Sequence, residues 1–123
     1  MLGNAPIMAF ISATDLATAR AYYEGVLGLA VTEVNDFACV LRGGGTMVRV
    51  THVDSLTPQP FTVLGWEVTN IESTVDDLTR RGIIFQRYDG MGQDERGIWT
   101  APSGAKIAWF PDPEGNILSV TQF

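Results

Sequence analysis

The sequence predicts an α+β fold built from two tandem βαβββ modules, and three observations support it. Two helix-capping residues, Asp15 and Asn70, each stand between a short apolar run and a segment with helical periodicity. Aligning these two caps superimposes one half of the chain on the other with a shift of 55 residues, from 15 to 70. Runs of strand-forming residues follow both helices. Neither half can bury its sheet face alone, so we expect curved mixed sheets around a central pocket.

Length and charge exclude several classes of protein. The 123 residues predict one domain, 1–123, with module one at about 5–55 and module two at about 60–123. The net charge of -6, without a Lys/Arg cluster, argues against a nucleic-acid partner. No apolar run approaches a membrane span of about 20 residues, and no export signal is evident. The single cysteine, Cys39, suits a reducing compartment, so we expect a cytoplasmic protein without a membrane partner.

The first module is predicted to begin with a strand at Ile7–Ser12. The segment LATARAYYEGVLG follows its cap and carries apolar residues at helical spacing until Gly28 ends it. The glycines at 43 to 45 predict a hairpin turn. Strands are expected at Ala30–Val34, Phe37–Leu41 and Thr46–Thr51.

The second module follows a linker that contains Pro58 and Pro60. A helix is predicted after Asn70, because Ile71, Val75 and Leu78 form an apolar stripe before Gly82. Strands are expected at Thr62–Val68, Ile84–Tyr88, Ile98–Thr100, Lys106–Phe110 and Asn116–Gln122. The glycine-rich segment YDGMGQDERGIW has two open interpretations, an exposed connection or a mobile lid over the pocket.

The stretch Asp112-Pro113-Glu114-Gly115 predicts a tight turn before the last strand. Proline at the second position and glycine at the fourth are typical of a type I turn. We therefore interpret Asp112 and Glu114 as structural residues rather than catalytic ones.

Two stretches together resemble a known family. The order T-D-L, a helix ending in Y-Y-E-G-V-L-G-L, and F-P-D-P-E-G-N-I-L near the C-terminus is similar to the glyoxalase / bleomycin-resistance / extradiol-dioxygenase superfamily, also called the vicinal oxygen chelate family. The resemblance covers essentially the whole chain. It implies the fold more firmly than the chemistry, because this fold hosts many activities. The bleomycin-resistance branch also implies a homodimer.

The same resemblance implies where a metal would be bound. Metal-dependent members place ligands on the first strand of each module and on the final strand, which correspond here to Met8, Val63 and Ser119. A further ligand position falls near Arg49. Divalent cations of this family prefer imidazole or carboxylate ligands, and the only histidine is His52. We therefore expect no metal and no cofactor.

The expected pocket is apolar and aromatic with a few polar groups, as is usual for a small-molecule site. The positions that the resemblance implies, extended by strand alternation, predict these ligand-binding residues: Met8, Phe10, Met47, Arg49, Val63, Glu67, Trp109 and Ser119. Arg49 and Glu67 have two open interpretations, an internal salt bridge or a pair that orients a ligand.

Two classes of function follow. The first is a metal-free, homodimeric protein that binds a small polar-aromatic compound. The second is a lyase, isomerase or dioxygenase-like enzyme in which Glu67 acts as a general base and Arg49 stabilises an oxyanion in place of a metal. A third possibility is a subunit that acts through dimerisation alone.

Overall fold

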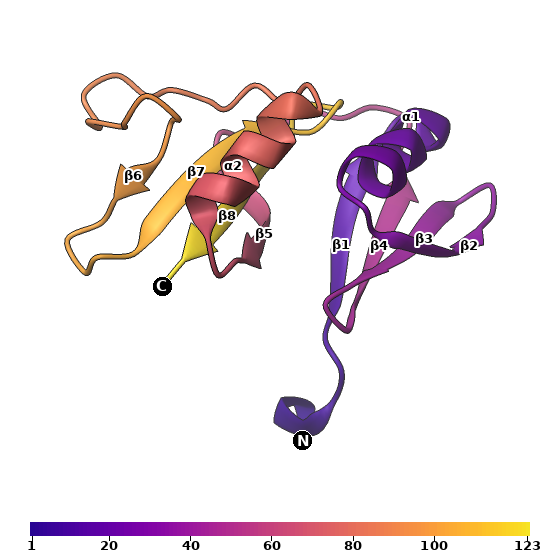
Figure 1. The fold of residues 1–123 in the computed structure, drawn as a ribbon. Helices are drawn as coiled ribbons and strands as arrows, with labels where there is room; N and C mark the ends of the chain where they lie inside the picture. The colour runs from indigo at the N-terminus through magenta and orange to yellow at the C-terminus, as the bar shows by residue number, and fades with distance from the viewer. The chain divides into compact units, whose positions relative to one another are not determined.

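The computed structural model describes residues 1–123, which form two compact units, Met1–Thr57 and Pro58–Phe123. Each unit contains a four-stranded mixed sheet with a helix against one face, in the order strand, helix and three strands (Figure 1). The strand order is β1-β4-β3-β2 in the first unit and β5-β8-β7-β6 in the second, so the two sheets have the same topology. The predicted α+β fold with two βαβββ modules is confirmed. No helix is long and apolar enough to cross a membrane.

The first unit carries its helical segment on one face of the sheet. Its elements are η1 (Leu2–Asn4), β1 (Met8–Ala13), α1 (Leu16–Arg20), η2 (Ala21–Val26), β2 (Ala30–Val34), β3 (Ala38–Gly43) and β4 (Thr46–His52). Strand β1 is parallel to β4, whereas β3 is antiparallel to both of its neighbours. The core under the helix includes Ile11, Ala13, Tyr23, Val48 and Val50, all nearly inaccessible to solvent.

The helix of the first unit begins at its predicted cap. The Asp15 carboxylate accepts hydrogen bonds from the Thr18 N–H (3.1 Å) and the Thr18 hydroxyl (2.8 Å). The α-helical hydrogen bonds end at Arg20, and the chain continues as a π-helical turn, η2, before Gly28 adopts a φ of 80°. Strand β3 begins after Phe37, because the Asn35 side chain accepts the N–H groups of Phe37 and Ala38.

The second unit repeats this plan with a longer helix. Its elements are β5 (Thr62–Glu67), α2 (Ile71–Arg80), β6 (Trp99–Thr100), β7 (Lys106–Pro111) and β8 (Ile117–Gln122). The Asn70 side chain accepts the Ser73 N–H (3.1 Å), as its predicted capping role requires. The core between α2 and the sheet includes Ile71, Val75, Ala108, Phe110, Leu118 and Val120.

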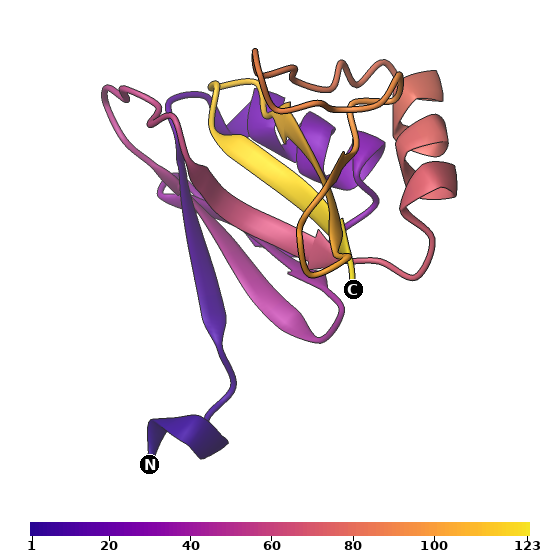
Figure 2. The ribbon, with the colours of Figure 1, turned by 90° about the vertical axis from the view of Figure 1, so that its left-hand side faces the viewer.

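The prediction of a strand at Ile84–Tyr88 is wrong. Figure 2 shows the chain between α2 and β6 as an irregular connection, drawn in salmon to orange. A backbone hydrogen bond from Gln86 N–H to the Trp109 carbonyl (2.8 Å) joins this segment to β7. The next N–H along this side, that of Tyr88, donates instead to the Gln93 side chain (2.7 Å). A side chain therefore takes the place of a strand partner.

The predicted turn before the last strand forms around Asp112. Its carboxylate accepts the N–H groups of Glu114 and Asn116, both at 2.9 Å, and the Asn116 side-chain amide at 3.0 Å. The Gly115 N–H closes the turn on the Asp112 carbonyl (3.0 Å). Asp112 is buried and satisfied by its own turn, which supports its structural interpretation.

Candidate functional site

The second sheet has one face against α2 and one face without a helix of its unit, here called the open face. Along β8 and β7, Leu118 and Phe110 point toward α2 and are fully buried. Ser119 and Trp109 have the opposite parity, and they are register partners across the two strands. Gly65 of β5 is the partner of Ser119 on its other side. One rung, Gly65–Ser119–Trp109, therefore crosses the open face.

Because Gly65 has no side chain, the Ser119 side chain can pack directly against the backbone of β5. A Cβ atom at position 65 would lie 2.7 Å from the Ser119 Oγ atom, closer than real Cβ contacts. The Ser119 side chain is mostly buried, yet no group of the chain hydrogen-bonds to its hydroxyl, and the oxygen retains contact with solvent. The rung thus presents a hydroxyl that is available to a ligand.

An aromatic pocket of about 180 Å³ lies at one end of this rung. Three aromatic side chains, Phe61, Tyr88 and Trp109, contribute to its walls, together with Pro60, Thr62, Met91 and Ile117. The Tyr88 and Trp109 rings meet edge to face, with centroids 5.6 Å apart at 87°. Trp99 supports Trp109 from the neighbouring strand at 6.1 Å. The indole of Trp109 is therefore fixed on one side and borders a cavity on the other.

The connection that carries Tyr88 and Met91 is held by its own polar side chains. The Gln93 amide donates to the carbonyls of Gln86 (2.9 Å) and Gly97 (2.8 Å) and accepts the Tyr88 N–H. The Asp94 carboxylate accepts the N–H groups of Arg96 and Ile98, both at 2.9 Å. The connection is therefore held together by its own side chains, and a role as a mobile lid stays a prediction.

The predicted site residues fall in both units. In the first unit Met8 is paired with Met47, and Phe10 with Arg49, on the face of the sheet opposite Ile11 and Val50. In the second unit Glu67 lies at the end of β5, and Val63 lies where the β5–β8 register shifts. Trp109 and Ser119 are brought together. The pairing of Arg49 with Glu67 and their catalytic roles stay predictions, as does ligand binding at Met8, Phe10, Met47 and Val63.

The sequence matches one family over nearly its whole length. Residues 6–120 match the Glyoxalase/Bleomycin resistance protein/Dioxygenase superfamily. The chain belongs to this superfamily. No curated protein sequence matches the chain.

Solved structures of the glyoxalase superfamily have the same fold. A superfamily member from Sphaerobacter thermophilus DSM 20745 has 21% identity and a TM-score of 0.76, with all of both chains covered. The glyoxalase/bleomycin resistance protein/dioxygenase from Alicyclobacillus acidocaldarius has 18% identity and a TM-score of 0.70, covering 98% of this chain and 92% of its own. Lactoylglutathione lyase from Agrobacterium tumefaciens has 19% identity and a TM-score of 0.70, covering 97% and 93%. At these identities the similarity concerns the fold alone.

The metal positions that the superfamily implies do not fit a divalent cation here. The implied positions are Met8 on β1, Val63 on β5, Ser119 on β8 and Arg49 on β4. None of these four residue types supplies an imidazole or a carboxylate. No group of three or more His, Cys, Asp or Glu side chains is arranged to hold a metal. The metal-free state itself stays a prediction.

Among the residues of the aromatic pocket that the sequence did not predict as site residues, three have large side chains: Phe61, Tyr88 and Met91. Phe61 belongs to the linker before β5, and the other two belong to the connection after α2. The available signal was the presence of large apolar side chains in segments rich in glycine and proline, where burial in a core does not explain them.

Proposed function

We propose that the protein binds a small aromatic compound, with one planar ring in the aromatic pocket beside Trp109. The observation that carries this proposal is the convergence of Phe61, Tyr88 and Trp109 on one cavity at the open face. Aromatic walls favour a planar ring, since stacked and edge-to-face contacts add to simple burial. A cavity of about 180 Å³ is smaller than most small-molecule sites, which span about 300–1,000 Å³, so it suits one ring rather than a whole ligand.

The rest of the ligand would lie along the rung toward Ser119. The Ser119 hydroxyl is both a donor and an acceptor, and Gly65 leaves the adjacent position without a side chain. A polar substituent on the ring can therefore be recognised next to an apolar end. These groups bind and orient a compound, and they need no metal.

The test is a thermal-shift screen with aromatic antibiotics, hydroxy acids and thiol conjugates. A ligand that binds the folded state raises the unfolding midpoint by mass action. The best compound is then titrated against Trp109→Leu and, as a matched control, Trp66→Phe. Trp66 stacks on Phe110, on the face toward α2. We expect Trp109→Leu to weaken binding about tenfold or more and Trp66→Phe to leave it unchanged. Equal affinity for both variants would overturn the proposed site.

A separate measurement tests the proposal that no metal takes part. Protein purified without chelators and dialysed exhaustively is expected to contain far less than one equivalent of Zn, Ni, Mn or Fe per chain by elemental analysis. The reason is that positions 8, 49, 63 and 119 offer no suitable ligand set. About one equivalent of any of these metals would contradict the proposal.

A further inference from the structure

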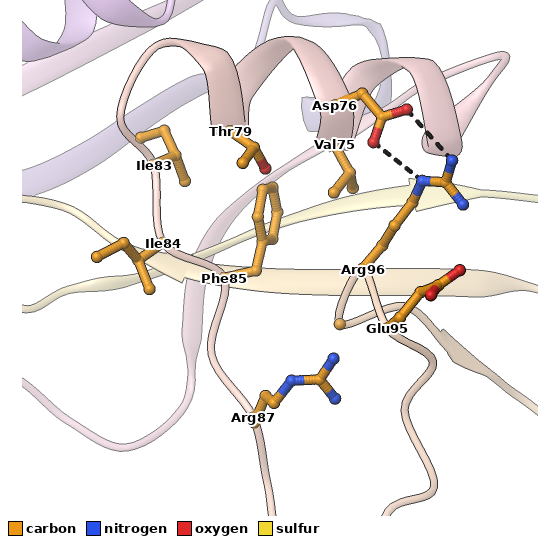
Figure 3. Close-up of a pocket in the computed structure, with 10 residues that line it drawn as sticks. Val75, Asp76, Thr79, Ile83, Ile84, Phe85, Arg87, Glu95 and Arg96 are labelled. Carbon is orange, nitrogen blue, oxygen red and sulfur yellow. Dashed lines mark hydrogen bonds and ion pairs between the residues drawn. The ribbon is translucent and has the colours of Figure 1, made fainter.

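A second pocket lies in the second unit, next to α2, and Trp109 is not among its residues. Its volume is about 320 Å³, and it is formed by α2, by the segment that follows this helix, and by the turn around Glu95 and Arg96 (Figure 3). None of its residues belongs to the aromatic pocket. Its size reaches the range in which small-molecule sites fall, about 300–1,000 Å³.

One part of this pocket is apolar. Val75 and Ile83 are buried beneath it, and the Phe85 ring stands in its centre in Figure 3. Phe85 is held in place by an edge contact with Phe110, with centroids 5.4 Å apart. Ile84 also lines the pocket and is 82% exposed, which is unusual for a large aliphatic side chain. An apolar ligand group can therefore cover surface that water now contacts.

The charged groups of the pocket are not equivalent. Arg96 and Asp76 form a two-point ion pair, at 2.9 Å and 3.3 Å, and neutralise each other. Arg87 donates one N–H to the Asp94 carbonyl but forms no ion pair. In Figure 3 its guanidinium points into the space below Phe85, whereas the Glu95 carboxylate points away from it. Arg87 and Glu95 are therefore the two charged groups of the pocket without an ion pair, and only the Arg87 guanidinium is directed into the space beside the apolar surface.

We propose that this pocket binds a small monocarboxylate with an aliphatic body. The planar guanidinium of Arg87 matches a carboxylate in a two-point hydrogen bond, and the aliphatic body covers Ile84 and Phe85. The unpaired carboxylate of Glu95 also lines the pocket, and it repels a doubly charged anion more strongly than a singly charged one. This favours a carboxylate over a phosphate monoester.

The test is a two-dimensional amide NMR titration with hexanoate as the probe. Hexanol and hexyl phosphate serve as the neutral and the doubly charged analogues. We expect saturable shifts at the amides of Thr79, Arg87 and Gly97, with hexanoate binding at least fivefold more tightly than either analogue. Absence of saturable shifts at these amides, or equal binding of hexanol, overturns the proposal. Tighter binding of hexyl phosphate overturns the choice of a carboxylate.

Single substitutions measure how much each side chain contributes to hexanoate binding. Arg87→Gln is expected to weaken hexanoate binding about tenfold, and Arg87→Lys to restore part of that loss through the charge alone. Ile84→Ser should weaken binding severalfold without unfolding the protein, because this side chain is exposed. Glu95→Gln should strengthen binding, since it removes a repulsive charge.

Trp109→Leu should have no effect on hexanoate binding, so failure of this proposal and failure of the aromatic site are distinguishable. Hexanoate affinity that is insensitive to Arg87→Gln overturns the assignment.

Discussion

Gly65 and Ser119 show how one missing side chain shapes the candidate site. The two residues are neighbours on β5 and β8, and the Ser119 Oγ occupies the space that a Cβ atom at position 65 would need. Elsewhere in a strand, replacing glycine with alanine stabilises a protein by about 0.4–1 kcal/mol through the unfolded state. Here steric overlap opposes that gain.

A double-mutant cycle tests this contact. We expect Gly65→Ala to destabilise the wild-type protein by about 1–3 kcal/mol, the usual cost of overpacking. In a Ser119→Ala background the obstructing oxygen is gone, and the same change should be neutral or stabilising. Urea unfolding of the four proteins measures both values. An equal cost in both backgrounds would show that the contact does not matter.

The pKa of Asp76 is lowered chiefly by Arg96 and to a smaller extent by the charge of Arg80. The hydrogen bond from Arg96 lowers the pKa of the Asp76 carboxyl below the ordinary value of 3.8. A lowered folded-state pKa means that the pair contributes stability above the unfolded value and loses this contribution as the pH falls through the folded one.

The prediction concerns the region below pH 3.8. Following the Asp76 carboxyl by NMR should give a midpoint below 3.8 in the wild type and a higher midpoint in Arg96→Gln. The difference in stability between wild type and Asp76→Asn should stay constant above this region and shrink as the pH falls through it. A midpoint that does not move in Arg96→Gln would contradict the assigned cause.

At the scale of elements, the connection between α2 and β6 replaces strand pairing with side-chain hydrogen bonds. Gln93 makes three hydrogen bonds to backbone groups of this segment, to Tyr88, Gln86 and Gly97. The aromatic pocket depends on this connection, because Tyr88 and Met91 are part of it.

Gln93→Ala is therefore expected to destabilise the protein by about 1–3 kcal/mol, because partly buried backbone groups lose their partners. Amide hydrogen exchange at Tyr88 should accelerate in this variant. Glu95→Ala is the matched control in the same connection, since this exposed side chain forms no hydrogen bond, and it should change neither value. Unchanged exchange at Tyr88 in Gln93→Ala would show that other contacts hold the connection.

At the scale of the whole molecule, the first strand of each unit lies at an edge of its sheet. Strands β1 and β5 are terminal strands, each with one edge that has no ladder partner in its own sheet. Several large apolar side chains on or next to β1 are exposed, including Ile7 at 77% and Phe10 at 62%. Unpaired strand edges and exposed apolar side chains are features that association between chains covers.

We therefore expect a homodimer, in agreement with what the family resemblance implies. Equilibrium sedimentation at micromolar concentration should give twice the mass of the chain. Phe10→Asp should shift the equilibrium toward the monomer, because it places a charge on an exposed apolar surface. A monomer for the wild type at this concentration would contradict the prediction.

The sequence by itself determined the features that depend on local interactions. The caps at Asp15 and Asn70, the turn at Asp112 and the order of the two modules were all predictable. The caps and the turn rest on hydrogen bonds and backbone angles within a few residues, so the local sequence contains the necessary information. The order of the modules follows from the 55-residue repeat of the caps. Ser119 was predicted as a site residue from the family resemblance, and Trp109 from strand alternation, which fixes the face of a strand on which a side chain lies.

Only the tertiary structure decided what depends on partners far along the chain. Ile84–Tyr88 has the composition of a strand, but a strand also needs a ladder partner, and the Gln93 side chain takes that place. The aromatic pocket joins the linker at Phe61, the connection at Tyr88 and β7 at Trp109. Nothing in the spacing of these residues indicates that they meet, because their proximity is set by how the connection packs against the sheet.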